Sequence, residues 1–148
     1  MPTNDDEKAL ALIEASVYKA QALLAQNQSF RPFLMLLNEA GEEEFYANER
    51  EDEDESYALL ENTLEERLKK SDIEVLVLVK EAGVPSHFKS TISQSIRVHL
   101  EERSQQDKKL SGRFLYVPYE YIPNEKPQAN IRLHAPLAVG FPLQYLRN

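Results

Sequence analysis

Apolar side chains recur every three or four positions in two long segments, and this spacing predicts two helices. Residues 5–26 contain neither glycine nor proline. Their apolar stripe consists of Leu10, Ile13, Val17, Ala20 and Leu24. Residues 52–70 show the same spacing, and their stripe consists of Tyr57, Leu60, Leu64 and Leu68. Each segment is therefore expected to form a helix with one buried face.

The remaining apolar segments are short, and they predict strands. Residues 33–37 and 71–80 hold nearly continuous apolar runs, and the second run suits a strand that is covered on both faces or strongly buried. Residues 95–101 alternate between apolar and polar positions, as a strand with one buried side does. Gly41 suits a hairpin loop because glycine takes a positive φ without steric cost, so residues 43–48 are expected to return as a second strand.

The C-terminal third of the chain carries weaker signals. Residues 113–122 predict an aromatic strand, in which Pro118 marks a bulge or a sheet edge. Residues 129–133 are a candidate for a further strand. The prolines and the glycine that follow predict a mostly irregular C-terminal tail, residues 130–148. Its many apolar side chains need cover, so the tail is expected to pack on the body or on a partner.

The order of elements predicts an α+β fold in the sequence α-β-β-α-β-β-β. The most economical layering is a mostly antiparallel sheet of about five strands, with the two helices packed on one face. The 148 residues suit a single domain, 1–148, and no internal repeat or linker divides them.

The net charge of −8 comes entirely from one segment. Residues 42–56 hold nine acids against Arg50, and the rest of the chain has 16 acids and 16 bases. Because phosphate binding needs clustered lysine and arginine, nucleic acid is not expected as a partner. The chain has no cysteine, which excludes thiol chemistry and thiolate zinc sites and fits a reducing cytoplasmic location. Acids stand where a secretion signal carries positive charge, and no apolar run reaches the length of a membrane span, so neither secretion nor a membrane partner is expected.

The densest part of this acidic segment permits two interpretations. Its carboxylates are Glu49, Glu51, Asp52, Glu53, Asp54 and Glu55. Asp52 as helix N-cap with Glu55 three residues later makes a capping box, which gives part of the run a structural role. The six carboxylates also form a candidate binding surface for a basic protein. Calcium is not expected, because an EF-hand frame starting at Asp52 puts Tyr57 at the glycine position and Thr63 at the bidentate glutamate.

Catalytic signatures are absent from the chain. It contains no nucleophile elbow, no zinc-protease motif and no glycine-rich phosphate loop, so no catalytic residue, metal or cofactor is predicted. The three histidines are His87, His99 and His134. A small-molecule-binding or hydrolytic pocket near His87, His99 and the aromatic strand is the alternative to a pure binding role.

Aromatic residues near the C-terminus form a second candidate surface. Phe114, Tyr116, Tyr119 and Tyr121 crowd one strand, where they serve core packing or a protein interface. The expected interface residues are Tyr116, Tyr119, Tyr121, Phe141 and Tyr145. A homodimer that uses them is one expectation.

The runs FRPFLMLLNEAGE, DESYALLENTLEE, IEVLVLV and SIRVHLEER together resemble small bacterial proteins of unknown function. The resemblance covers roughly residues 30–103 and implies a bacterial, cytosolic α+β protein. It supplies no catalytic residues. The leading hypothesis is therefore a non-enzymatic cytoplasmic protein-interaction module, an acidic binder or neutraliser of a basic protein.

Overall fold

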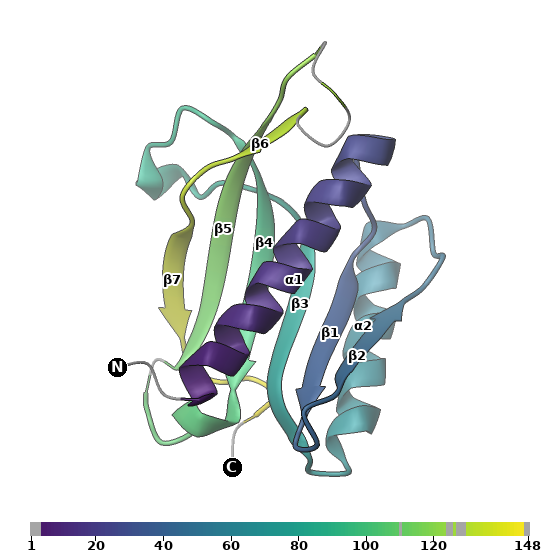
Figure 1. Cartoon of the computed structure of the whole chain (residues 1–148), viewed down its shortest axis with the longest axis vertical. Helices are drawn as coiled ribbons and strands as arrows, with labels where there is room; N and C mark the ends of the chain where they lie inside the picture. The colour runs from purple at the N-terminus through teal and green to yellow at the C-terminus, as the bar shows by residue number, and fades with distance from the viewer. Residues whose placement is uncertain (1–3, 110, 124–125, 127–129, 147–148) are drawn as a thin grey trace.

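The computed structural model describes residues 4–109, 111–123, 126 and 130–146 and shows two helices and a seven-stranded antiparallel sheet (Figure 1). The helices are α1 (Asn4–Asn27) and α2 (Glu53–Leu68). The strands are β1 (Phe33–Asn38), β2 (Glu43–Ala47), β3 (Ile73–Gly83), β4 (Gln94–Glu102), β5 (Gly112–Tyr121), β6 (Ile131–Leu133) and β7 (Leu137–Phe141). Two single-turn 3₁₀ helices, η1 (Ser86–Phe88) and η2 (Arg103–Gln105), lie in connections.

The strand order is β2-β1-β3-β4-β5-β6, and β7 also pairs with β5. Every recorded pairing among the described residues is antiparallel. The predicted α+β class and antiparallel sheet are therefore confirmed, and the predicted order of elements holds through β5. The predicted count of about five strands is too low, because two short strands follow β5. The strand β6 lies within the candidate strand at residues 129–133, whereas β7 lies in the part of the tail expected to be irregular. Residues 147 and 148 of that predicted tail lie outside the described residues.

The strands β6 and β7 share the outer side of β5, with a one-residue change of register between them. Tyr119 faces Leu133, whereas Tyr116 faces Leu137, so the outer chain uses one residue more. Pro118 lies at this point, and its carbonyl accepts a hydrogen bond from the backbone N–H of His134 at 2.8 Å. Its nitrogen points to the same side of the strand. Proline lacks a backbone N–H donor, and this lack is tolerated here because the pairing on the outer side of β5 is already irregular.

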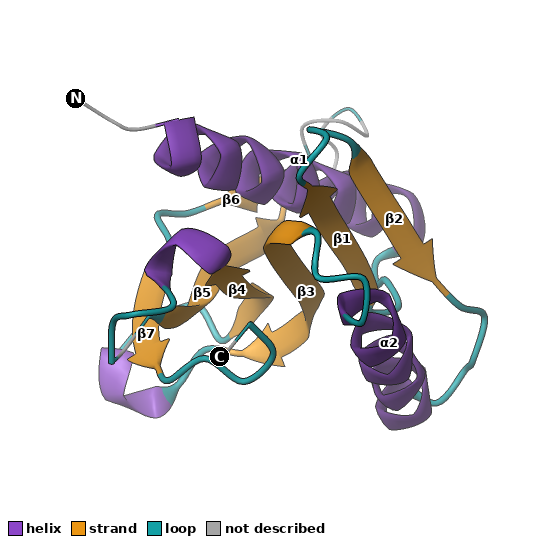
Figure 2. Ribbon diagram, turned by 90° about the horizontal axis from the view of Figure 1, so that it is seen from below, coloured by secondary structure: helices purple, strands orange, loops and turns teal. Residues whose placement is uncertain are grey.

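The two helices lie on opposite faces of the sheet (Figure 2), so the prediction that both pack on one face is wrong. The reason is visible in β1. Phe33, Met35 and Leu37 join the core under α1, whereas Leu34 and Leu36 join the core under α2. A strand that is apolar on both sides needs cover on both sides, and one helix layer cannot supply it.

Local sequence signals account for the turn before β2 and for the start of α2 after it. Gly41 has a φ of +81° in the loop between β1 and β2, as the hairpin prediction required. Asp52 is the N-cap of α2 and accepts a hydrogen bond from the backbone N–H of Glu55 at 3.0 Å, which confirms the predicted cap. Among the described residues, neither helix combines the length and apolar character needed to cross a membrane.

Candidate functional site

The six predicted acidic residues surround the start of α2, and all of them are exposed. Glu53, Asp54 and Glu55 form the first turn of the helix, where negative charge interacts favourably with the helix dipole. Glu53 also makes an ion pair with Lys80 of β3 at 3.1 Å. Part of the acidic segment is therefore structural.

A groove of about 780 Å³ adjoins the acidic segment, and its floor is aromatic. It lies between the C-terminal half of α1, the end of β2 and the start of α2. Phe33 contacts Phe30 at 5.8 Å and Phe45 at 5.5 Å between ring centroids. Phe33 is 1% exposed, whereas Phe45 is 47% exposed. The buried ring therefore supports an exposed one, and the exposed ring offers apolar surface to a partner.

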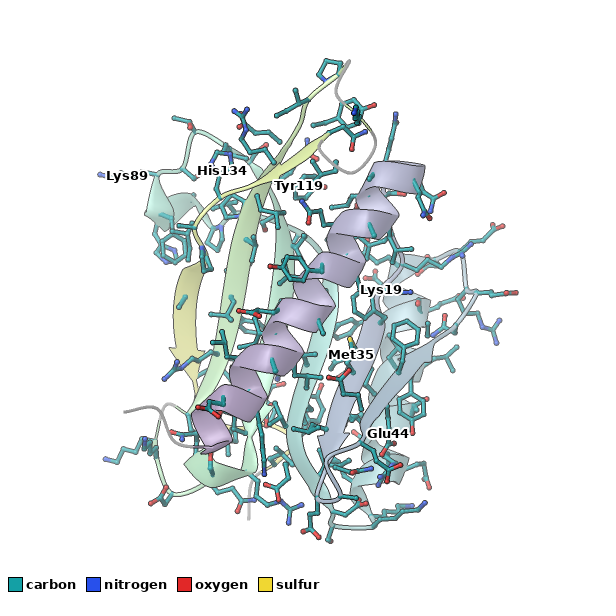
Figure 3. All side chains as sticks on the ribbon, in the orientation of Figure 1. Lys19, Met35, Glu44, Lys89, Tyr119 and His134 are labelled. Atoms are coloured by element: carbon teal, nitrogen blue, oxygen red, sulfur yellow. The ribbon has the colours of Figure 1, made fainter. Side chains whose placement is uncertain are left out.

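Charged side chains line the walls of this groove. Lys19 reaches from α1 toward β2, and its Nζ lies 5.1 Å from the centre of the Phe45 ring (Figure 3). Glu51, Glu53 and Glu81 provide carboxylates, and Arg31 provides a second cation. Burial raises the pKa of Glu81, although a hydrogen bond with the backbone of Phe30 opposes this shift. A cationic group placed near Glu81 would favour its charged form.

A smaller recess of about 340 Å³ lies beside the groove, at the end of β3 and the start of β4. Glu81 lines both spaces, and Tyr119 lines the smaller one. Burial also raises the pKa of Tyr119, and the nearby Glu81 adds to that shift. The two groups form a polar wall next to the groove.

An ion-pair cluster fixes β2, which forms one side of the groove. Arg67 of α2 donates to Glu44 of β2 at 2.6 and 2.7 Å and to Asp72 at 2.5 and 3.0 Å. Tyr46 donates its hydroxyl to Glu44. These contacts lower the pKa of Glu44 to about 2, with the Arg67 hydrogen bonds as the largest cause and burial opposing them. The cluster ties the short edge strand to α2.

The three histidines lie in three different environments. His99 is buried, and its Nε2 lies 2.6 Å from Glu101. His134 is partly exposed and pairs with Glu120 at 2.8 Å. The His87 ring lies 4.3 Å from the ring of its neighbour Phe88. Neither recess is lined by a histidine among the residues that the structure describes.

The predicted aromatic interface residues do not share one surface. Tyr119 is buried in the core under α1, and Tyr121 is exposed. Phe141 and Tyr145 pack around His99 on the other face of the sheet, with ring centroids 4.8 and 5.3 Å from the histidine. Tyr116 is half-buried beside Phe114, whose ring also contacts His99. The rings of Phe114, Phe141 and Tyr145 surround His99.

A buried carboxylate holds the C-terminal segment, residues 143–146, against the sheet. Glu101 accepts hydrogen bonds from the backbone N–H groups of Gln144, Tyr145 and Leu146 at 2.9 to 3.2 Å. Burial raises the pKa of Glu101, but hydrogen bonds from His99 and from this backbone outweigh it, so the net shift is downward. Leu146 then joins the core under α2.

Sequence reasoning missed the groove residues Lys19, Phe33, Phe45 and Glu81. Each lies in a segment whose own pattern indicates ordinary helix or strand, and the groove exists only where these segments meet. The one local signal is Phe45, an aromatic residue among the glutamates of a weakly alternating strand. Among the described residues, no group of three or more histidine, cysteine, aspartate or glutamate side chains is placed to hold a metal ion.

The fold and the groove define an α+β protein with an open sheet edge and an amphipathic surface beside it. No protein-family model matches the chain. Comparison with curated proteins and with solved structures finds no significant match. The resemblance to small bacterial proteins of unknown function therefore stays an expectation.

Proposed function

We propose that this protein is a non-enzymatic, cytoplasmic protein-interaction module that binds a basic segment of a partner protein. The observation that carries the proposal is the groove beside β2, whose aromatic floor opens between exposed carboxylates. A partner segment that contacts Phe45 buries apolar surface on both sides, which favours binding. The carboxylates favour a segment that carries positive charge.

The distribution of charge supports a basic partner. The excess of −8 is confined to residues 42–56, and these residues include β2 and the connection to α2. Glu51 and Glu53 of this connection line the groove itself. Acids gathered on one side of an otherwise neutral protein attract cationic segments over roughly one Debye length, about 8 Å at physiological salt.

A catalytic or small-molecule role has weaker support. His99, at the centre of the alternative hypothesis, is enclosed by aromatic rings and bonded to Glu101. Carboxylates and a tyrosine line the groove and the smaller recess, but no described histidine lines either of them. No group of side chains that could hold a metal ion is found among the described residues.

A binding experiment with a model peptide tests the proposal. The probe is Lys-Thr-Lys-Thr-Leu-Thr-Lys-Thr-Lys with blocked ends, measured by isothermal titration calorimetry at low salt. The groove variant carries Glu51→Gln and Glu53→Gln at two residues that line the groove, and Glu49→Gln beside them in the acidic segment. We expect its affinity to fall by about tenfold, and we expect the wild-type affinity to fall at about 0.5 M salt, where charges are screened within a few ångströms.

The matched control variant carries Glu7→Gln, Glu14→Gln and Glu65→Gln. These three exposed glutamates lie on α1 and α2 outside the groove, and their loss changes the net charge by the same amount. We expect the control to bind nearly as well as the wild type. Equal losses in both variants would show that net charge, and not the groove, attracts the peptide. No binding by the wild-type protein would refute the proposed function.

A further inference from the structure

The strand β2 forms one edge of the sheet. It pairs with β1 along its whole length, and the described strand order places nothing on its other side. The opposite edge consists of two short strands, β6 and β7, which pair one after the other with β5, so among the described strands β2 is the edge strand next to the groove. An edge with unpaired backbone groups is a template for a further strand, and proteins that do not use such an edge generally cover or charge it.

The hydrogen-bonding pattern of the β1–β2 hairpin shows which backbone groups are open. Asn38 donates its backbone N–H to the carbonyl of Glu42 at 3.1 Å, so these two residues form a hydrogen-bonded pair. Such pairs alternate along an antiparallel ladder. Glu44 and Tyr46 therefore point their backbone groups toward β1. The N–H and C=O groups of Glu43, Phe45 and Ala47 then point toward the open edge.

We propose that the partner segment binds in an extended conformation and adds to the open edge of β2 as an antiparallel strand. This inference rests on the proposed function and specifies how the partner is held. Backbone hydrogen bonds to Glu43, Phe45 and Ala47 provide affinity without regard to sequence, and side-chain contacts on the two faces provide selectivity.

The face of β2 that points toward α1 defines the chemistry of the partner. Glu43, Phe45 and Ala47 share this face because strand side chains alternate, and the groove opens beside the last two. A residue directly opposite Phe45 lies on the same face and meets its exposed ring. The matching partner carries an apolar residue at that position. Basic residues two positions away then lie opposite Glu43 at one end and near Glu51 at the other.

A second copy of the same chain fits this edge poorly. Antiparallel self-pairing centred on Phe45 would bring two segments together that each carry a charge of −8. Like charges on adjacent strands are destabilising, and acidic residues on an edge strand are a common means of preventing self-association. The same glutamates that exclude a second copy favour a cationic segment. Charge complementarity therefore selects the basic partner as the occupant.

Two methylated forms of the model peptide test strand addition separately from charge. When the leucine lies opposite Phe45, the N–H groups of the leucine and lysines point toward β2, and those of the threonines point outward. N-methylation of the leucine and of the two nearest lysines removes three N–H donors that face β2 and puts methyl groups in their place, without altering the charge. We expect this peptide to bind at least about tenfold more weakly, whereas the peptide with three N-methylated threonines keeps its affinity.

Amide hydrogen exchange measured by NMR gives an independent readout. Binding of the unmodified peptide should slow exchange at Glu43, Phe45 and Ala47, whose N–H groups point outward in the free protein. Glu44 and Tyr46 serve as internal controls, because β1 already holds their N–H groups. A variant with Ala47→Pro removes one outward N–H group without breaking a bond to β1, and it should weaken binding, whereas Ala47→Ser should not.

The outcomes separate this inference from the proposed function. If both methylated peptides bind as tightly as the unmodified one and the groove variant still weakens them, the basic-segment binder stands and strand addition is wrong. If no peptide binds, both proposals are wrong. If the three outward amides are already protected in the free protein in a concentration-dependent way, a second copy occupies the edge and the inference fails.

Discussion

Replacing Glu101 with alanine should detach the C-terminal segment from the sheet and destabilise the protein by about 3 kcal/mol. Glu101 is 0% exposed and accepts three backbone N–H groups from residues 144–146. A buried donor left without an acceptor costs about 1 to 3 kcal/mol. The lower value applies here, because water can reach the donors once this segment loosens, and three donors at about 1 kcal/mol give the total.

The chain provides a matched control for this substitution. Glu120 also pairs with a histidine, His134, at 2.8 Å, but its side chain is 46% exposed. An exposed ion pair contributes about 0 to 1 kcal/mol, so Glu120→Ala should change the free energy of unfolding little. Urea unfolding followed by circular dichroism measures both variants near neutral pH. If Glu101→Ala costs no more than Glu120→Ala, the buried carboxylate does not hold the segment.

The same variant makes a prediction about pH. The folded protein lowers the pKa of Glu101 below its ordinary value of 4.5, so the stabilisation is fully present above that value. It is lost as the pH falls through the lower pKa of the folded state. The difference in unfolding free energy between wild type and Glu101→Ala should therefore shrink below about pH 4.5. A difference that stays constant down to the acid transition would contradict the assigned role of the carboxylate charge.

Two further substitutions test contacts made by the outer strands β7 and β2. A Cβ at Gly112 would overlap the ring of Phe141, so Gly112→Ala should cost about 1 to 3 kcal/mol in urea unfolding, whereas Gly83→Ala, which meets no atom closer than 3.8 Å, should cost far less. Equal costs would show that Phe141 moves aside freely. Arg67→Met should raise the pKa of Glu44 from about 2 toward 4.5, because the guanidinium hydrogen bonds are its largest cause, and carbon-detected NMR titration of the carboxyl group measures this. A pKa that stays near 2 would refute that cause.

Local sequence signals predicted the parts of the fold that depend on neighbouring residues. The helical spacing located α1 and α2, and the short apolar runs located β1 and β3. Asp52 was predicted as a cap because capping involves a side chain and a backbone group three residues apart. Gly41 was predicted at a turn for a similar local reason. The strand β7 was missed because prolines on both sides of a five-residue apolar run are equally typical of an irregular segment.

The placement of the helices depended on both faces of the central strands. The apolar run of β3 suits a strand that is covered on both faces or strongly buried, whereas the most economical layering places both helices on one face of the sheet. The structure resolves this conflict, since the two sets of apolar residues in β1 and β3 each need a helix. The predicted acidic residues are exposed near the start of α2. Their position beside an aromatic groove does not follow from their places in the sequence, because the aromatic residues come from other segments of the chain.

The sequence by itself determined the class of fold, the ends of the helices and the confinement of the excess charge to residues 42–56. These properties follow from residues that interact along the chain or from simple counting. Tertiary structure alone decided that β2 is an edge strand, that Phe45 lies on Phe33 beside the acids, and that Glu101 binds the C-terminal segment. Contacts between residues far apart in sequence depend on strand order and on which face each side chain takes, and neither leaves a local pattern.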